Sequence, residues 1–197
     1  DVCSSDLGEL AQMMNMEGWI KGGPCRLRVV KMKQYTHNDL RSLPVSPSPN
    51  LTEMNAVYLY PSLCFFEGTR VSVGRGTDRP FQQVGYPSLK DGDVQFTPKG
   101  MESAPNPPYR DTLCHGWDLA HHVEDTTDLP RQINLQWIIK MYASYPDKAK
   151  FFNPFFDKLA GTTKLREQIQ KGMDEDQIRA SWKQDIDEFM LKRKKYL

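Results

Sequence analysis

The chain has 197 residues, of which 39% are apolar and 26% are charged, and its formal net charge is +1. These values are ordinary for a globular protein with a sizeable core, and they exclude extensive disorder. Lys and Arg are mixed with Asp and Glu, so no overall field would attract nucleic acid or an anionic membrane. No apolar run approaches the roughly 18 residues of a membrane span.

The first residues have the form of a sequencing artefact. The string CSSDL, Cys3–Leu7, is encoded by TGC TCT TCC GAT CTN, which resembles the end of a common sequencing adapter. We therefore expect residues 1–7 to be an assembly scar and the chain to be the C-terminal part of a longer protein. Without Cys3, the remaining cysteines show neither a disulfide framework nor a CxxC spacing.

The next segment predicts a helix followed by a strand. Leu10, Met13 and Met14 recur at helical spacing, and the glycines that follow supply a stop signal. Arg26–Met32, RLRVVKM, is predicted to be a strand. Such a helix, turn and strand are typical of the last αβ unit of a larger α/β domain. The boundary is expected at Pro44–Asn50, PVSPSPN, because its three prolines favour an extended connector.

Three segments beyond this connector predict the strands of a second domain. Ala56–Phe66 is almost continuously apolar and predicts one or two buried strands, with Pro61 at a break or an edge. Residues 85–108 are rich in proline and glycine, so they are predicted to be mostly loop with one brief strand at the FTP segment. Leu113–Leu119 is predicted to resume a strand.

The last third of the chain predicts helices. Apolar residues from Ile133 to Tyr142 recur at helical spacing, and Pro146 ends that helix. A second helix is expected to begin after Thr163, whose side chain would cap it, and to stop before Gly172.

A final helix is predicted from a capping-box pattern. Asp174 and Gln177 have the spacing at which each side chain bonds the backbone of the other. The apolar residues behind this box recur at core spacing and are expected to pack against the sheet. They are Ile178, Trp182, Ile186 and Phe189.

The segment Glu67–Phe81, EGTRVSVGRGTDRPF, is the strongest candidate for a binding site. It places three arginines and three glycines in fifteen residues directly after an apolar run. Such a loop commonly presents polar groups to a small anionic ligand, although its glycine spacing is not that of a nucleotide-binding loop. Two glycines flank Arg75, whose planar guanidinium suits a carboxylate. Ligand binding and a structural pairing of Arg75 with Glu67 or Asp78 both stay open.

Other titratable residues support weaker hypotheses. Glu67 could be a general acid whose pKa desolvation raises, or it could be held ionised by neighbouring arginines. Cys114 and His115 cannot act as a nucleophile and base pair, because adjacent strand residues point to opposite faces. A zinc site that adds His121 and His122 fits no standard ligand spacing, so no metal is expected.

Several strings occur in a characteristic order: SPSPN, YPSLCFFEGTRVSVGRGTDRPFQQVGYP, FTP, CHGWDL and FFDKLAGTTKLREQI. From about Gly8 to Leu197 this order resembles the C-terminal half of the NamZ/YbbC-type exo-β-N-acetylmuramidases. The resemblance implies an α/β glycoside hydrolase that removes terminal N-acetylmuramic acid from peptidoglycan fragments, without a metal or organic cofactor. Residues 8–43 would end a truncated Rossmann-like domain, and residues 44–197 would be an auxiliary α+β domain forming one wall of the active-site cleft.

The resemblance also suggests site residues. The family's proposed catalytic glutamate belongs to the N-terminal half, which this chain lacks, so the chain alone is expected to be inactive. Tyr60 matches the position of an active-site tyrosine, and Arg75, or next Arg79, is expected to bind the lactyl carboxylate of the substrate. Further expected substrate contacts, besides the candidate catalytic Glu67, are Asn50, Ser72, Thr77 and Phe81. Two departures from the family pattern are YPS in place of YPG and Arg70 in place of asparagine.

Two alternatives to a hydrolase remain. The chain could belong to a noncatalytic module that binds muramyl sugars, which a missing carboxylate opposite Tyr60 would favour. It could instead be a structural interaction domain, which an Arg75 guanidinium buried in an internal ion pair would favour. The family's cell-wall substrate implies an exported or periplasmic protein.

Overall fold

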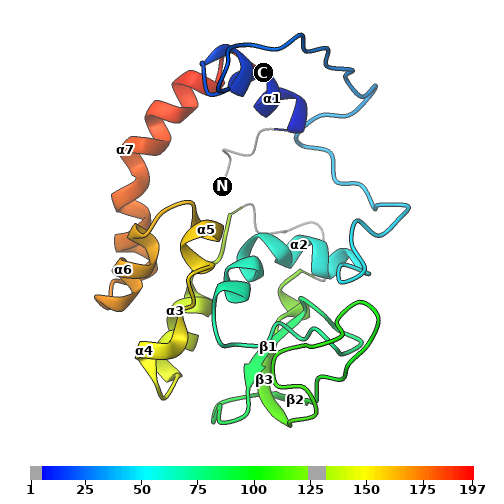
Figure 1. Cartoon of the computed structure of the whole chain (residues 1–197), viewed down its shortest axis with the longest axis vertical. Coiled ribbons are helices and arrows are strands. Elements are labelled where there is room, and N and C mark those ends of the chain that lie inside the picture. Colours follow the sequence, from blue (N-terminus) through cyan, green and yellow to red (C-terminus); the bar gives the residue numbers. More distant parts are fainter. Residues whose placement is uncertain (1–5, 124–131) are drawn as a thin grey trace. The chain divides into compact units, whose positions relative to one another are not determined.

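The computed structural model describes residues 6–123 and 132–197. The chain divides into two compact units. The large unit is Ser42–Ile178, and the small unit combines the segment up to Arg41 with Arg179–Leu197. Helices together with one small antiparallel sheet make up the fold, which confirms the α/β expectation (Figure 1).

The sheet of the large unit has three short strands. They are β1 (Gln83–Tyr86), β2 (Val94–Phe96) and β3 (Cys114–Asp118), in the order β1-β3-β2, and both pairings are antiparallel (Figure 1). β3 confirms the strand predicted over residues 113–119, and β2 is a brief strand that overlaps the FTP segment only at Phe96. The central strand approaches β1 closely, because Gly85 and Gly116 face each other across the pair.

The segment predicted as buried strands is helical, so that prediction was wrong. α2 (Met54–Leu63) continues directly into the 3-10 helix η1 (Cys64–Gly68). The sequence did not reveal the helical period of this segment, because its outward-facing residues are apolar as well as its inward-facing ones. Pro61 lies inside α2, and 3-10 hydrogen bonding begins within the next turn. The inward positions, spaced three or four apart and 0–1% exposed, are Ala56, Leu59, Leu63 and Phe66.

Within the described residues, five short helices follow the sheet. They are η2 (Ala120–Val123), α3 (Gln136–Ser144), α4 (Lys148–Phe151), α5 (Phe156–Ala160) and α6 (Lys164–Gln170). α3 and α6 confirm the two helices predicted there. The expected side-chain cap was wrong, because Thr163 makes no capping hydrogen bond. Instead, the hydroxyl of Thr162 accepts from the Lys164 N–H at 3.2 Å.

The small unit contains α1 (Leu7–Met16), which confirms the first predicted helix. A capping box between Asp6 and Glu9 begins it. The strand predicted over residues 26–32 was wrong, because this segment is irregular and largely exposed. A single strand leaves its backbone groups unpaired, and the described residues of the small unit contain no second strand to bond it.

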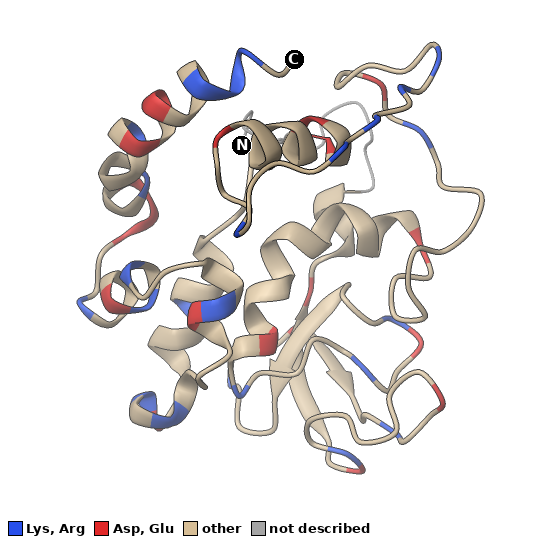
Figure 2. Ribbon diagram, turned by 45° about the horizontal axis from the view of Figure 1, so that its top comes forward, with Lys and Arg blue, Asp and Glu red and all other residues tan. Residues whose placement is uncertain are grey.

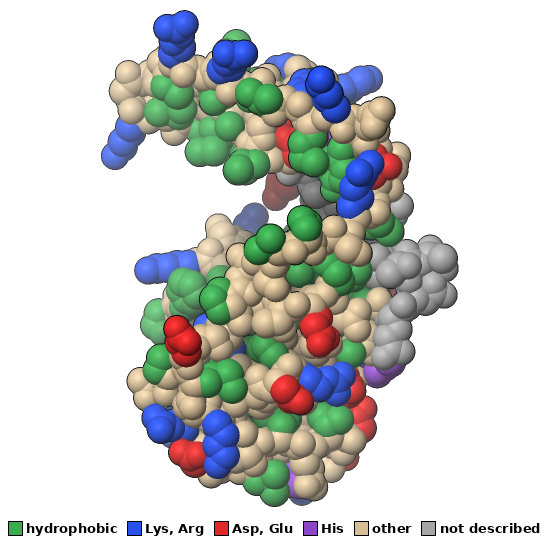
Figure 3. Space-filling model, turned by 90° about the vertical axis from the view of Figure 1, so that its right-hand side faces the viewer, with side chains coloured by type: hydrophobic (Ala, Val, Ile, Leu, Met, Phe, Trp, Pro, Cys, Tyr) green, Lys and Arg blue, Asp and Glu red, His purple; other side chains and the backbone are tan. Residues whose placement is uncertain are grey.

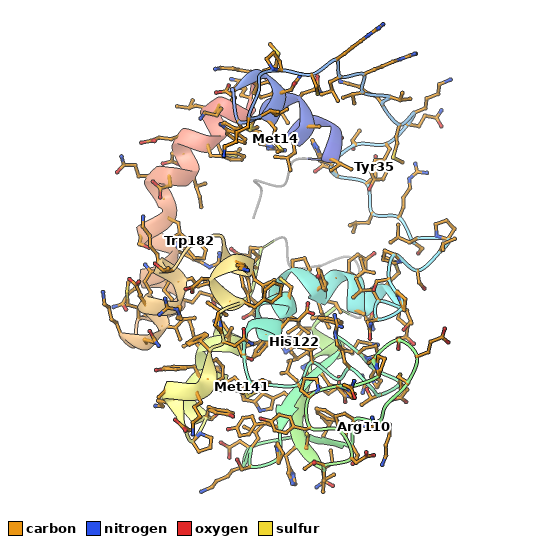
Figure 4. The ribbon with its side chains drawn as sticks, viewed as in Figure 1. Met14, Tyr35, Arg110, His122, Met141 and Trp182 are labelled. Carbon is orange, nitrogen blue, oxygen red and sulfur yellow. The ribbon has the colours of Figure 1, made fainter. Side chains whose placement is uncertain are left out.

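Helix α7 (Glu175–Arg193) begins with the predicted capping box. The Asp174 carboxylate accepts from the Gln177 N–H at 2.8 Å, and the Gln177 amide oxygen accepts from the Asp174 N–H at 3.1 Å. Of the predicted core face only Ile178 is fully buried. Its other members, Trp182 (labelled in Figure 4), Ile186 and Phe189, are partly exposed. Acidic and basic residues are both distributed along this helix (Figure 2). None of the described helices has the length and apolar content needed to cross a bilayer.

The end of η1 packs against α5 without any intervening side chain. A Cβ atom added at Gly68 would overlap the Cα of Phe156 and lie 2.7 Å from its Cβ. The Gly68 carbonyl also accepts from the Asn153 N–H at 2.9 Å, which fixes its position. A glycine is therefore required where the α2–η1 segment turns into the glycine-rich loop.

We expect Gly68→Ala to lower the free energy of unfolding of the chain by about 2–3 kcal/mol, because backbone atoms must move to admit the methyl group. Gly161→Ala is the matched control. Gly161 has φ +70° but no neighbour within 4 Å, so only the left-handed backbone penalty of about 1 kcal/mol applies. Urea unfolding measures both, and equal losses would contradict the close packing.

Candidate functional site

The glycine-rich segment is fixed to the sheet by its backbone. Ser72 and Gly85 exchange two hydrogen bonds of 2.9 Å, and the Phe81 N–H donates to the Val73 carbonyl at 2.7 Å. Residues 72–81 therefore form a closed loop at the edge of β1. The loop needs glycine at Gly76, where φ is +83° and a Cβ would lie 2.5 Å from the Lys99 carbonyl oxygen.

The loop brings four of the predicted site residues together, and we call them the Arg75 cluster: Tyr60, Glu67, Arg75 and Phe81. One Nη of Arg75 donates to Glu67 Oε2 at 2.7 Å. The guanidinium carbon lies 5.4 Å from the centre of the Phe81 ring, in cation–π geometry. The Tyr60 and Phe81 rings meet edge to face, with their centres 5.1 Å apart.

The Arg75–Glu67 pair is only partly buried, and it does not use all the hydrogen-bond donors of Arg75. The side chains are 36% and 21% exposed, so both still reach solvent. Within the described part of the chain, Arg75 Nε is buried and has no hydrogen-bond partner. Structural pairing with Glu67, one of the two alternatives that the sequence left open, is therefore present, but the guanidinium keeps unused donors.

A pocket of about 310 Å³ opens beside this pair. One wall carries Glu67 and Arg75, and Ser103–Pro108 forms the other. The Asn50 amide donates to the Ser103 carbonyl at 3.0 Å and is 7% exposed, so it supports the second wall from behind. The pocket combines apolar surfaces, such as Val71 and Val73, with one ion pair, which is typical of small-ligand sites.

Arg79, the second candidate for a substrate carboxylate, is bound elsewhere. Its two Nη atoms donate to the two Asp118 oxygens at 2.7 and 2.9 Å. Burial would raise the pKa of Asp118, but the hydrogen bonds from Arg79 and from the Ala120 N–H outweigh it and hold that pKa below its ordinary value. Asp118 was not predicted as a site residue, although it ends the CHGWD string. It satisfies Arg79 and ties the loop to β3.

The two predicted hydroxyl contacts serve the loop itself. Ser72 is fully buried, and its hydroxyl accepts from the Gly74 N–H at 3.2 Å. The Thr77 hydroxyl donates to the Gly74 carbonyl at 2.7 Å and accepts from the Arg79 N–H and the Gln83 amide. Contact of either hydroxyl with a sugar stays a prediction.

Tyr60 is the exposed aromatic member of the Arg75 cluster, with 36% of its surface accessible. Partial burial, then the nearby Glu67 carboxylate and Cys64, raise its phenol pKa, while Arg75 lowers it. The net pKa lies above the ordinary value, so the phenol is protonated at neutral pH and can donate a hydrogen bond. Burial likewise raises the pKa of the Cys64 thiol to about 11, which argues against a nucleophilic cysteine there.

The remaining candidates do not join this site. The rings of His121 and His122, the latter labelled in Figure 4, lie 4.1 Å apart, and burial lowers the pKa of His122. Among the described residues, the one group with metal-ligand proximity is Asp6, Glu9 and His37 in the small unit. Arg70, the departure from the family pattern, is exposed. Acidic and basic side chains lie beside one another on the face of the large unit seen in Figure 3.

We expect Asp118→Asn to destabilise the chain at pH 7 and to destabilise it less at pH 3. The folded pKa of Asp118 is depressed, so its stabilising contribution is complete above about pH 4 and is lost as the pH falls through the folded value. Urea unfolding at both pH values measures the difference from the parent chain. Arg79→Ala should show the same pH dependence, and a difference independent of pH would contradict the pairing.

Two family models match almost the whole chain. Residues 58–197 match the exo-beta-N-acetylmuramidase NamZ, C-terminal model, and residues 5–55 match the corresponding N-terminal model. The chain is 32% identical over 207 residues to the peptidoglycan beta-N-acetylmuramidase NamZ of Bacillus subtilis strain 168. This match covers 97% of the chain but 49% of the relative, so the chain spans about half the length of that protein.

Solved structures with the same fold support this relationship. A DUF1343 family protein from Bacteroides fragilis NCTC 9343 is 44% identical with a TM-score of 0.90, covering 97% of this chain and 54% of the other. A second DUF1343 protein from that strain, 22% identical with a TM-score of 0.74 over 96% of this chain and 55% of its own, shows the fold alone. Because the C-terminal model matches most of the residues, the chain belongs to the NamZ exo-β-N-acetylmuramidase family.

Proposed function

We propose that the complete protein is an exo-acting glycoside hydrolase that releases terminal N-acetylmuramic acid from peptidoglycan fragments. The observation that carries this proposal is the match of both NamZ models along one chain. The relative from B. subtilis is named for this activity on peptidoglycan. The present chain would supply one wall of the cleft, and the family's catalytic glutamate would lie in the other half, so the chain alone would be inactive.

The Arg75 cluster would face the reacting sugar in this proposal. Tyr60 is exposed and its phenol is protonated at neutral pH, so it could donate to an oxygen at the reacting centre. Arg75 lines a pocket and its side chain is 36% exposed, and N-acetylmuramic acid differs from N-acetylglucosamine by a lactyl carboxylate. Arg75 is therefore the better candidate for the lactyl group, because Arg79 is already bidentate with Asp118.

The remaining expectations about the whole protein stay part of this proposal. Residues 8–43 would end a Rossmann-like domain, and residues 44–197 would form the auxiliary domain. A cell-wall substrate would place the protein in the periplasm or outside the cell.

A structural role of the loop is the second candidate. The ion pair between Arg75 and Glu67 favours it, because such a pair can simply stabilise the loop. The partial exposure of both side chains and the adjoining pocket favour binding instead. The experiment that tests the proposal uses the complete protein encoded by the source gene. It compares cleavage of a chromogenic N-acetylmuramide with cleavage of the matching glucosaminide. Cleavage of the muramide with a much higher kcat/KM than the glucosaminide supports the proposal, and a folded protein that cleaves neither favours a binding or structural role.

We expect Arg75→Ala in the complete protein to lower kcat/KM on the muramide by roughly 10- to 100-fold more than on the glucosaminide, because a charge-assisted hydrogen bond to the lactyl group is lost. Arg166→Ala is the control, since Arg166 also pairs with a carboxylate, donating to the two oxygens of Asp157 at 2.9 Å, and does not line the pocket. Equal losses of kcat/KM on both substrates would show that Arg75 does not bind the lactyl group.

We expect Tyr60→Phe to lower kcat on the muramide by about 100-fold with little change in KM, the range typical of a lost proton donor. The substitution keeps the ring that packs on Phe81. Tyr58→Phe, on the same helix, is the control and should leave kcat unchanged. A rise in KM at constant kcat would make Tyr60 a binding residue instead.

A further inference from the structure

We infer that Phe81 is a positioning residue, whose ring sets the orientation of Arg75 and Tyr60 without touching the sugar. This inference rests on the proposed function, because it assigns the arrangement of the proposed muramyl site. The ring is 1% exposed, so its faces and edges are occupied by protein atoms. Direct contact between Phe81 and a substrate would require these neighbours to move away.

The backbone of Phe81 has the less common left-handed conformation. Its φ is +57°, a value that bulky side chains rarely adopt because of steric strain. Two features fix this backbone conformation. The Phe81 N–H donates to the Val73 carbonyl at 2.7 Å, and Pro80 directly before it restricts the chain. A glycine would satisfy this backbone without strain, so the phenylalanine side chain must supply something that the loop needs.

The ring contacts two members of the Arg75 cluster at once. The Arg75 guanidinium lies over it at 5.4 Å, and the Tyr60 ring meets it edge to face at 5.1 Å and 64°. Both side chains are 36% exposed and would otherwise sample several rotamers. The buried ring gives each a fixed support, so the donors of both point in a defined direction before a ligand arrives.

Glu67 alone would not fix the guanidinium. It accepts from one Nη of Arg75, and a single hydrogen bond leaves the plane of the guanidinium free to rotate. The aromatic face below restricts that rotation. Arg79 provides the contrast within the same loop, because both of its Nη atoms are held by Asp118 and it needs no aromatic support.

Fluorinated phenylalanine at position 81 tests the electrostatic part of this inference. One, two and three ring fluorines weaken the cation–π attraction in steps with little change in volume. We expect kcat/KM of the complete protein on the muramide to fall in the same steps, by roughly two- to fivefold in total, which is the usual range for such contacts. The glucosaminide should show a smaller decrease. A flat series on both substrates overturns the inference.

A double-mutant cycle tests whether Phe81 acts through Arg75. Phe81→Leu removes the ring, and its effect on muramide kcat/KM should be smaller when Arg75→Ala is already present. Phe151→Leu is the control for simple loss of packing, because Phe151 is equally buried but contacts the rings of Tyr142, Tyr145 and Phe152. Its effect should be additive with Arg75→Ala. If the effects of Phe81→Leu and Arg75→Ala were additive as well, Phe81 would act only through core packing and the inference would be overturned.

The same cycle measured by unfolding separates this inference from the proposed function. In the 197-residue chain, the urea midpoint shift caused by Phe81→Leu should be smaller in the Arg75→Ala background. If the parent protein cleaves no muramide but this coupling is found, the enzymatic proposal fails while the Phe81–Arg75 contact stands. Absence of the coupling overturns the contact whatever the activity.

Discussion

The reciprocal backbone hydrogen bonds between Ser72 and Gly85 hold the glycine-rich loop to the sheet, and the candidate site depends on them. Gly85 is required there, because a Cβ would overlap the His115 carbonyl on β3. The close approach of β1 and β3 thus fixes the base of the loop. From this base the loop reaches α2 through the contact between Phe81 and Tyr60, so helix and sheet contribute to one cluster.

The two arginines of the loop illustrate two uses of the same side chain. Arg79 is satisfied by both oxygens of Asp118, which suits a residue that holds the loop in place. Arg75 has one bond to Glu67, a buried Nε without a partner among the described residues, and an aromatic ring below it. Because its side chain is 36% exposed beside a pocket, Arg75 can still donate to a ligand carboxylate, although Glu67 competes for the same charge.

Local signals in the sequence predicted several elements correctly. The capping box at Asp174 and Gln177 forms because it depends on neighbouring residues alone. β3 was also predicted from its local sequence, at residues 113–119. The strands expected over residues 56–66 failed because a continuous apolar run contains both periods, and only burial against a sheet and helices distinguishes them. The strand expected over residues 26–32 failed because a strand requires a partner that local sequence does not specify.

By itself, the sequence determined the family, the glycine-punctuated loop and the residue types at the candidate site, since motif order and composition are properties of the chain. It also indicated that Arg75 could pair with Glu67, but not whether it would. Only the tertiary structure decided that Arg79 binds Asp118, that Phe81 is buried beneath Arg75, and that Ser103–Pro108 forms the opposite pocket wall. These contacts join residues that are far apart in sequence or opposed across a loop, and their geometry follows from packing that no local pattern encodes.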